Sequence, residues 1–343
     1  MRPSANQAGL LAATAAALVL LVVPPLAFEV FTLVNATIYL IMATLALSLA
    51  LVWGFGGILC LGQSMFYGLG AYAYAVTVLN TGESTLPILL GVALPVAFAA
   101  VLGYFMFWGR VSDVYLAVIT LTVSLILFHL INSTAGDQYR IGEALLGGYN
   151  GLPGLPPINW PGDPDRPISF EGMYLLAAAV LVATYFGLRW LLHSHFGRVT
   201  VAIRENEARA GLLGYDVHRH KLWVLMIGAG IAGLAGVLSV SWGSFVGPNV
   251  FSIVFTAQII VWILVGGLGT LIGPIVGAVA IQFLIAWLGE AKIADTNLVL
   301  GALFVLFVLL VPKGLVPMLA ERLRPWAARR FPELAEPGSG DPL

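Results

Sequence analysis

Histidine is the residue in this sequence best suited to acid–base or metal chemistry, because its side chain titrates near neutral pH and binds metals readily. Two His-x-His pairs occur, at His193 and His195 and at His218 and His220. Residues two apart on a helix point in different directions, and both pairs lie in a basic, polar region, which favours surface side chains over a metal site. His129 lies alone in an apolar segment with no carboxylate beside it, which favours a packing role. We therefore predict no catalytic residue and no metal site.

A Gly-x-Gly-x-x-Gly pattern covers Gly228–Gly233. A dinucleotide-binding loop with this spacing needs a preceding strand and a following helix in a soluble unit. Here the pattern lies inside an apolar segment, where small residues let membrane helices approach closely, so we expect helix packing. The sequence has no G-x-x-x-x-G-K-[ST] loop. If transport is driven by nucleotide hydrolysis, ATP and Mg²⁺ must bind to another chain, and we predict no cofactor on this one.

Two glycine-rich stretches interrupt apolar segments, Gly56–Tyr72 in the first half of the chain and Gly266–Pro274 in the second. Paired interruptions are typical of the translocation path of transporters, but the same glycines also permit close helix packing. The pattern alone does not separate the two roles. The candidate path residues are Gly57, Cys60, Gly62, Gln63, Ser64, Tyr67, Gly70, Gly266, Gly267 and Gly269.

The longest charged segment between apolar runs is Gly197–Lys221. Apolar and charged residues alternate at helical spacing over Val199–Leu213, which predicts one short amphipathic helix. Gly214 offers the left-handed residue at which helices often end. Such a helix either docks onto a soluble partner or lies on the bilayer surface, and the pattern leaves both open.

The elements that hold these residues are membrane helices. Of 343 residues, 59% are hydrophobic and 10% are charged, whereas a soluble domain has about 25% charged residues. Lipid explains the deficit, because a charge at the bilayer centre is costly. The predicted fold class is all-α, a polytopic transmembrane helical bundle with about 8–10 spans. The single cysteine, Cys60, excludes an intrachain disulfide.

Ten apolar segments approach the roughly 20 residues that a helical span needs. They cover residues 8–27, 31–53, 57–80, 86–108, 112–132, 172–193, 221–244, 253–268, 270–289 and 297–312. The eighth and ninth abut at Gly266–Gly269, so they are either two full spans or a pair of short, broken helices. The first segment, with Leu10–Val23, is expected to be a retained span rather than a cleaved signal peptide.

The distribution of Lys and Arg predicts the orientation, because cytoplasmic loops are enriched in them. With Gly197–Lys221 in the cytoplasm, thirteen of the sixteen Lys and Arg residues fall on the cytoplasmic side. Only Arg140, Arg166 and Lys292 fall outside. Both termini are then cytoplasmic, whereas the reverse orientation would place thirteen positive charges on the wrong side.

Residues 1–320 are predicted to form one transmembrane domain. Its external loop, residues 133–171, is rich in Gly, Pro and Asp, and we expect it to fold as a cap without long helices. Its cytoplasmic loop, residues 194–221, contains the charged segment. Residues 321–343 form a cytoplasmic tail whose acidic, Pro- and Gly-rich end is expected to be partly disordered.

Four motifs together resemble the inner-membrane permease subunits of branched-chain amino-acid ABC transporters, specifically the larger of their two permease types (the LivM type). They are GGILCLGQSMFYGLGAY at Gly56–Tyr72, GGYNGLPGLP at Gly147–Pro156, FGRVTVAIRENEARAGLLGYDVHRHKL at Phe196–Leu222, and VGGLGTLIGPIVGA at Val265–Ala278, followed by PKGL at Pro312–Leu315. They occur in the family's order and span nearly the whole chain. Urea and short-amide permeases share the same pattern, so the motifs barely separate these substrates.

The resemblance implies a multi-pass permease of the inner (plasma) membrane that is not itself an enzyme. It would translocate leucine, isoleucine or valine, with urea or a short amide as the alternative substrate. The implied partners are a second permease subunit in a heterodimer, two ATP-binding subunits that hydrolyse ATP, and a periplasmic solute-binding protein. No nucleic-acid partner is implied.

The resemblance also assigns the cytoplasmic loop to contact with the ATP-binding subunits. ABC permeases carry an E-A-A-x-x-x-G element there; this chain keeps the spacing at Ala208–Gly214 but lacks the glutamate, and Glu205 and Glu207 lie just upstream. Cys60 likewise stands where the family usually has serine. The predicted coupling residues are Arg204, Glu205, Glu207, Arg209 and Gly214.

An ion-coupled carrier and a membrane-embedded enzyme remain alternatives. Ion-coupled carriers commonly place a carboxylate at depth, and embedded enzymes usually need titratable groups. No predicted span has Asp, Glu, Lys or Arg near its middle, which disfavours both classes.

Overall fold

A computed structural model describes residues 5–291 and, beyond them, residues 299, 301, 302, 314, 318 and 322; at 5–12, 26, 290 and 291 it describes the backbone alone. The α-helices are α1 (Ala5–Ala27), α2 (Val30–Leu49), α3 (Gln63–Thr81), α4 (Thr85–Trp108), α5 (Asp113–Asn132), α6 (Phe170–His193), α7 (His195–Glu205), α8 (Glu207–Leu212), α9 (Val217–Gly243), α10 (Ile253–Gly266) and α11 (Ile272–Ala291). The shorter elements are a π-helix, η1 (Ala50–Phe55), two 3-10 helices, η2 (Gly148–Asn150) and η3 (Pro248–Phe251), and the strands β1 (Arg140–Ile141), β2 (Ala144–Leu145), β3 (Leu152–Pro153), β4 (Asn159–Trp160), β5 (Asp163–Pro167) and β6 (Phe245–Val246).

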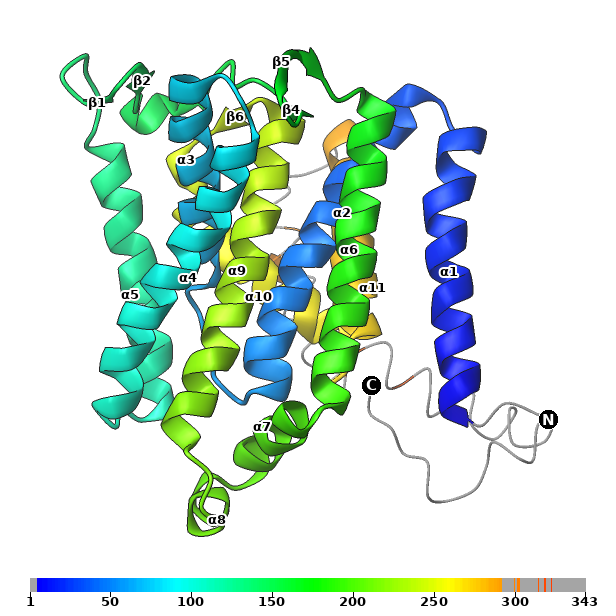
Figure 1. Cartoon of the computed structure of the whole chain (residues 1–343), viewed down its shortest axis with the longest axis vertical. Coiled ribbons are helices and arrows are strands. Elements are labelled where there is room, and N and C mark those ends of the chain that lie inside the picture. Colours follow the sequence, from blue (N-terminus) through cyan, green and yellow to red (C-terminus); the bar gives the residue numbers. More distant parts are fainter. Residues whose placement is uncertain are drawn as a thin grey trace.

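The long helices stand side by side as a bundle, with the strands at one end and α7 and α8 at the other (Figure 1). α3, α4 and α9 pack on one another, α2 packs on α6, α9 and α11, and α10 pairs with α11. α1 stands at the edge of the bundle against α6, where the Tyr174 hydroxyl donates to the Leu20 carbonyl at 2.9 Å. The strands of the described residues form only two-stranded pairs, so the predicted all-α class is confirmed.

Six helices of the described residues are long and apolar enough to cross a membrane, and each coincides with a predicted segment. They are Val30–Phe55, Thr85–Trp108, Asp113–Asn132, Phe170–His193, Val217–Gly243 and Ile272–Gly289. α1, α3 and α10 correspond to three further predicted segments. The tenth, residues 297–312, lies outside the described residues except at three positions, and of the tail only residue 322 is described. The chain is therefore a multi-pass membrane protein.

Two predicted segments differ from the structure in their limits. The helix predicted over 57–80 begins only at Gln63, because the chain leaves helical geometry at Gly57, whose φ is +69°. The pair predicted at 253–289 is unequal, with 14 residues in α10 and 20 in α11. At 1.5 Å per residue, α10 is about 21 Å long, shorter than the roughly 30 Å hydrocarbon layer, whereas α11 matches that layer.

The Gly228–Gly233 pattern lies inside α9 and serves helix packing, as predicted. A Cβ atom on Gly233 would fall 2.6 Å from the carbonyl oxygen of Gly91 on α4. A Cβ atom on Gly236, one turn further, would meet the backbone of Tyr67 on α3. These glycines allow three helices to approach at backbone distance, which is the use that membrane helices make of small residues.

The predicted external loop folds as a cap on the end opposite to α7 and α8 (Figure 1). β1 pairs with β2, β4 with β5, and β3 with β6, which follows α9. Asn80 near the end of α3 accepts from the backbone N–H of Glu143 at 2.8 Å and donates to the carbonyl of Ile141 at 2.9 Å. Asn159 Oδ1 accepts from the N–H of Ser84 at 2.9 Å. These bonds fix the cap to the ends of α3 and α4, and they confirm the prediction of a folded cap.

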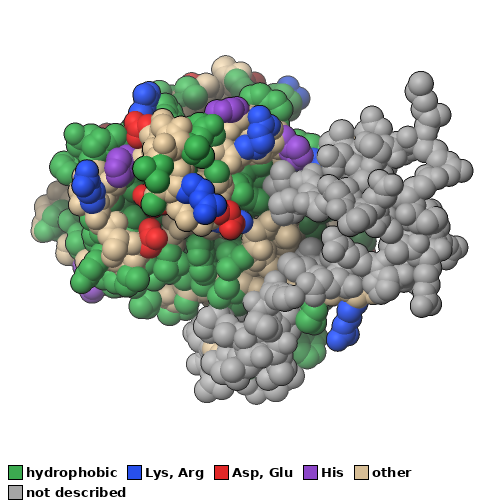
Figure 2. Space-filling view, turned by 90° about the horizontal axis from the view of Figure 1, so that it is seen from below, with side chains coloured by type: hydrophobic (Ala, Val, Ile, Leu, Met, Phe, Trp, Pro, Cys, Tyr) green, Lys and Arg blue, Asp and Glu red, His purple; other side chains and the backbone are tan. Residues whose placement is uncertain are grey.

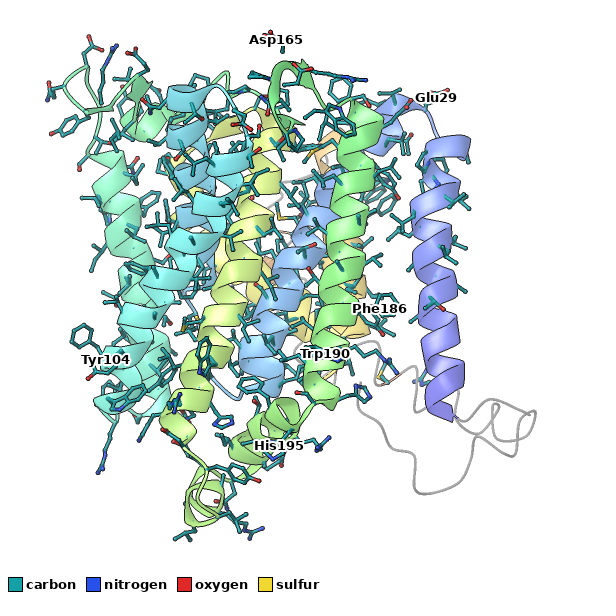
Figure 3. The ribbon with its side chains drawn as sticks, viewed as in Figure 1. Glu29, Tyr104, Asp165, Phe186, Trp190 and His195 are labelled. Atoms are coloured by element: carbon teal, nitrogen blue, oxygen red, sulfur yellow. The ribbon has the colours of Figure 1, made fainter. Side chains whose placement is uncertain are left out.

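Aromatic side chains project outwards from the sides of the bundle towards the α7–α8 end. Tyr104 on α4 and Trp190 on α6 point away from the helices (Figure 3), and Trp190 is 74% exposed. Such residues typically lie at the interface between membrane and water. Figure 3 also places Asp165 at the opposite end from His195. The two polar ends are separated by an apolar band, and which end faces the cytoplasm stays a prediction.

Candidate functional site

The first interrupted segment joins α2 to α3. α2 continues into the π-helix η1, and the chain then turns at Gly57, whose left-handed φ of +69° favours glycine. The N–H of Ile58 donates to the carbonyl of Val52 at 3.0 Å. The N–H of Leu61 donates to the hydroxyl of Thr120 on α5 at 3.1 Å. Non-helical backbone at membrane depth is tolerated where protein groups satisfy it, and these bonds do so.

The second interrupted segment joins α10 to α11. Gly267 and Gly269 have φ values of +113° and +81°. The Thr270 hydroxyl accepts from the N–H of Gly273 at 3.1 Å, at the start of α11. Gly314 packs on this segment, since a Cβ atom on it would meet the backbone of Gly267. Both predicted interruptions are therefore present as breaks in the helices.

The two interrupted segments meet at the α7–α8 end of the bundle. A Cβ atom on Gly54, in η1, would lie 3.3 Å from the backbone nitrogen of Gly269. Arg204, in the last turn of α7, bonds to the first segment: its Nη1 donates to the carbonyl of Gly54 at 2.6 Å, and its Cγ lies 2.8 Å from where a Cβ on Gly57 would stand. It lies near the second segment, since its Nη1 is 3.8 Å from where a Cβ on Gly269 would stand. We call Gly54, Gly57, Arg204 and Gly269 the inner junction.

The predicted single helix over Val199–Leu213 is wrong, because the structure has two helices there. Asn206 interrupts them with a φ of −160°, and its side-chain Oδ1 accepts from the N–H of Arg209 at 2.9 Å. Asparagine is a strong N-cap residue, so α8 starts anew at this point. α7 begins earlier than predicted, capped by Ser194. Gly214, with a φ of +88°, follows the end of α8 as predicted.

α7, α8 and the start of α9 form a small folded unit. Its core consists of Val199, Ile203, Ala210 and Val217, with Tyr215 packed against them. Lys221 on α9 binds Glu207 at 2.5 Å and lies 3.7 Å from Asp113 at the start of α5. The unit is thus fixed to the bundle at Lys221 and at the inner junction.

The five predicted coupling residues do not share one surface. Arg204 turns towards the inner junction and also pairs with Glu205, at 2.5 Å. Glu205 and Glu207 keep 66% and 48% of their side chains exposed, and Arg209 and Gly214 are exposed. The contribution of each residue to coupling stays a prediction, but Arg204 belongs to the inward face and the other four to the outward face.

Sequence reasoning missed the exposed apolar end of α8. Leu212 is 89% exposed and Leu213 is 72% exposed, although the single-helix prediction placed Leu213 on the apolar face. The break at Asn206 turns α8 relative to α7, which explains the difference. Figure 2 shows this end of the molecule, where hydrophobic side chains alternate with Lys, Arg, acidic and His side chains. Adjacent exposed leucines on a charged surface are typical of an interaction site.

The polar path residues predicted on α3 are buried in the bundle. Gln63 Nε2 donates to the hydroxyl of Ser48 at 2.9 Å and to the carbonyl of Gly228 at 3.3 Å, while its Oε1 has no partner among the described residues. Ser64 bonds to two hydroxyls on other helices. The Tyr67 ring is buried. The side chains of Ser64 and Tyr67 both face α10, where Ser64 contacts Thr256 and Tyr67 contacts Phe255.

The two hydroxyls that bond to Ser64 belong to Ser124 on α5 and Thr256 on α10. Neither residue stood out in the sequence, because single hydroxyl residues within apolar segments carry no distinctive pattern. Both become visible only when the three helices are placed together.

The remaining predicted path residues lie in close helix contacts. A Cβ atom on Gly70 would fall 2.5 Å from Cα of Gly233, and one on Gly62 would fall 2.7 Å from the backbone of Thr120. Gly266 packs in the same way on α11. Cys60 is fully buried. Whether these residues also line a path stays a prediction.

The histidine pairs lie at the α7–α8 end, where His195, His218 and His220 contact aromatic rings and His193 bonds to the carbonyl of Arg189. The ring of His218 lies 5.7 Å from that of Trp108, and that of His220 stacks on Phe196 at 5.3 Å. Within the part of the chain that the structure describes, no group of three or more His, Cys, Asp or Glu side chains is placed to hold a metal. These side chains therefore behave as part of the folded surface.

Comparison with known proteins shows a likeness that covers most of the bundle, from α2 onwards. A family model described as branched-chain amino acid transport system / permease component matches residues 28–310. The high-affinity branched-chain amino acid transport system permease protein LivM of Escherichia coli (strain K12) is 29% identical over 341 residues, covering 90% of this chain and 75% of that protein. The protein of the same name from Salmonella typhimurium is 29% identical over 321 residues, covering 84% and 71%.

A more distant relative is the probable branched-chain amino acid transport permease protein LivM of Methanocaldococcus jannaschii, 25% identical over 304 residues, covering 76% of this chain and 81% of that protein. No solved structure matches. The family match covers most of the chain and includes both interrupted segments and the α7–α8 unit. The chain therefore belongs to the family of permease components of branched-chain amino acid transport systems.

Proposed function

We propose that this chain is a permease subunit of an ABC importer that moves branched-chain amino acids across the inner (plasma) membrane into the cytoplasm. Its partners are a second permease subunit, two ATP-binding subunits and a periplasmic solute-binding protein. ATP is bound and hydrolysed on the ATP-binding subunits, and this chain does no chemistry on the solute. The observation that carries the proposal is the inner junction, where one arginine of α7 bonds to the first interrupted segment at Gly54, the residue on which the second segment packs.

The α7–α8 end faces the cytoplasm in this proposal, with both termini on the same side. Support comes from the placement of the two large loops at opposite ends of the bundle and from the excess of Lys and Arg on the α7–α8 side. The cap of residues 133–171 then faces the solute-binding protein, and the exposed end of α8 faces the ATP-binding subunits.

Coupling runs through backbone contacts. When the ATP-binding subunits close, they move α8 and α7, and the bond from Arg204 to the Gly54 carbonyl moves the end of η1 with them. The second interrupted segment follows, because it packs on Gly54 at Gly269. Displacing both breaks together alters access to the bundle from the cytoplasm, as alternating access requires.

Uptake by the assembled transporter in sealed vesicles tests the proposal. Labelled leucine is expected to enter when ATP and the loaded solute-binding protein are present, and to enter equally well in the presence of an uncoupler. Uptake of labelled urea instead of leucine would assign the chain to short-amide import. Uptake that an uncoupler abolishes and ATP depletion leaves intact would identify an ion-coupled carrier.

Replacing Leu212 and Leu213 together with serine is expected to weaken attachment of the ATP-binding subunits. Burial of a leucine side chain contributes about 1.5–3 kcal/mol, so loss of two such contacts should lower the amount of ATP-binding subunit that co-purifies by more than tenfold. Leu130→Ser is the control, since Leu130 is 55% exposed at the opposite end of the bundle. Unchanged co-purification together with weaker binding of anionic vesicles would show that α8 lies on the bilayer instead.

A further inference from the structure

Three hydroxyl groups from three helices meet inside the bundle. Oγ of Ser64 on α3 lies 2.9 Å from Oγ of Ser124 on α5 and 2.7 Å from Oγ1 of Thr256 on α10. All three side chains are buried. The Ser124 hydroxyl donates to the carbonyl of Phe251 at 3.0 Å, which uses its one hydrogen. Ser64 must then donate to Ser124, and Thr256 to Ser64, so the bonds form a chain with one direction.

Aromatic rings continue this contact along the same face of α3. The ring of Tyr67 lies 5.2 Å from that of Phe255, and the ring of Tyr72 stacks on Phe251 at 5.7 Å. The Tyr72 hydroxyl is buried and has no partner among the described residues. A Cβ atom on Gly68 would meet the Phe251 ring. We call this contact the hydroxyl–aromatic seam; it consists of Ser64, Tyr67, Ser124, Phe251, Phe255 and Thr256.

α5 contributes to the seam with little apolar packing. In its apolar stretch 22% of the residues are buried, compared with 67% in α9. Two of its four buried residues carry hydroxyls, Thr120 and Ser124, and both bond across to other elements. The dispersion energy between helices grows with the area that is packed. Because little of α5 is packed, moving α5 away from the bundle loses few dispersion contacts. The bonds that would break are mainly hydrogen bonds, which a polar solute can replace.

We infer that the hydroxyl–aromatic seam is the solute site of this chain, and that it takes a small zwitterion with an aliphatic side chain. The inference rests on the proposed function. The hydroxyl hydrogens suit a carboxylate, and the lone pairs of Thr256 Oγ1, which is the first donor of the chain and accepts no bond within it, suit an ammonium group. The rings of Tyr67, Phe251 and Phe255 suit the branched hydrocarbon.

The direction of the hydroxyl chain also explains how the site closes without solute. When the solute leaves, Thr256 bonds to Ser64, Ser64 to Ser124, and Ser124 to the carbonyl of Phe251. None of these three hydroxyls is then left unpaired inside the bilayer, where an unpaired polar group is costly. The closed seam is then dry and blocks leakage. Predicted path glycines such as Gly70 remain helix contacts in this arrangement, and the solute passes on the α5 and α10 side of α3.

Cysteine accessibility tests the inference in the complete transporter. Ser124→Cys and Thr256→Cys are treated with a small hydrophilic thiol reagent, first at rest and then while ATP and leucine-loaded binding protein drive turnover. Cys60 is the only native cysteine and is buried, so the unmodified chain gives the background. The matched control is Thr44→Cys, because Thr44 is also a buried hydroxyl but bonds within its own helix, to Leu40, at 3.0 Å.

Labelling of both seam cysteines is expected to become several-fold faster during turnover, and excess leucine should slow it, while Thr44→Cys stays at the background rate. Equal rates for seam and control cysteines, in a transporter that takes up leucine, would overturn the inference. Leucine uptake by the unmodified transporter reports on the proposed function separately.

A second variant covers the case in which a cysteine disturbs folding. Thr256→Val keeps the shape of the side chain but removes the hydroxyl, and it should raise the leucine concentration needed for half-maximal uptake while ATP hydrolysis and assembly persist. Thr256→Ser, which keeps the hydroxyl, should restore uptake. A Thr256→Val transporter with unchanged leucine dependence would also contradict a solute site at the seam.

Discussion

Arg204→Ala is expected to lower leucine uptake by the assembled transporter at least about tenfold while the ATP-binding subunits stay attached. The substitution removes the hydrogen bond from the guanidinium to the Gly54 carbonyl. A hydrogen bond to a charged group contributes about 1.5–3 kcal/mol, which corresponds to roughly a ten- to hundredfold shift in an equilibrium. Since this bond joins α7 to the first interrupted segment, its loss separates movement of α7 from movement of the bundle. ATP hydrolysis should continue with little uptake.

Arg198→Ala provides the matched control, because Arg198 also lies on α7, is exposed, and donates to the carbonyl of His193 rather than to the inner junction. It should retain most of the uptake. Arg204→Lys should fall between the two, since lysine keeps the charge but not the planar fork that reaches Gly54 and Glu205 together. The measurement is the number of leucine molecules transported per ATP hydrolysed. An Arg204→Ala transporter with the native ratio would show that coupling follows another route.

The inner junction can also be disturbed from its other side. A Cβ atom on Gly57 would lie 2.8 Å from Cγ of Arg204, and the φ of +69° at this position is strained for any other residue. Gly57→Ala should therefore displace Arg204 and reduce the same transport ratio. Agreement between the two variants would tie the effect to the junction rather than to either residue alone.

The broad architecture follows from the sequence because lipid imposes strong rules. Long apolar runs must be helical when their backbone is removed from water, so all described predicted segments contain helices. The cap over 133–171 and the polar unit around α7 also follow, since turn residues and charges are excluded from the bilayer interior. The patterns could not predict the start of α3 at Gln63, because the preceding residues are held outside a helix by distant partners such as Thr120 on α5, whose hydroxyl accepts from the N–H of Leu61.

The candidate site was harder to predict for a related reason. A charged side chain in an amphipathic helix is expected to face water, yet Arg204, with 32% of its side chain exposed, also donates to the backbone carbonyl of Gly54 in η1. Asn206 was placed within one continuous helix, although its capping side chain divides that helix in two. Ser124 and Thr256 have ordinary sequence surroundings, and only the meeting of α3, α5 and α10 gives them a shared role.

Gly70→Ala is expected to destabilise the bundle, in contrast to Gly187→Ala. A Cβ atom at position 70 would fall 2.5 Å from Cα of Gly233 and 2.7 Å from the carbonyl oxygen of Gly91. Both are backbone atoms, so α3 must move away from α9 and α4 to make room. Overpacking of this kind typically lowers the free energy of unfolding by about 1–3 kcal/mol. Because no flexible side chain can move aside here, we expect a loss near the upper end of that range.

Gly187 is the matched control because it is also a helical glycine, on α6, but a Cβ atom there would meet no described atom within 4 Å. Replacing it with alanine should leave stability unchanged or raise it by up to about 1 kcal/mol through helix propensity. Thermal unfolding of the two purified variants in detergent gives the comparison. If Gly70→Ala unfolds at the native temperature but transports leucine poorly, Gly70 lines the path, as its place in the glycine-rich stretch first suggested. If it unfolds several degrees lower, its role is the close approach of α3, α4 and α9, and the path lies on the other face of α3.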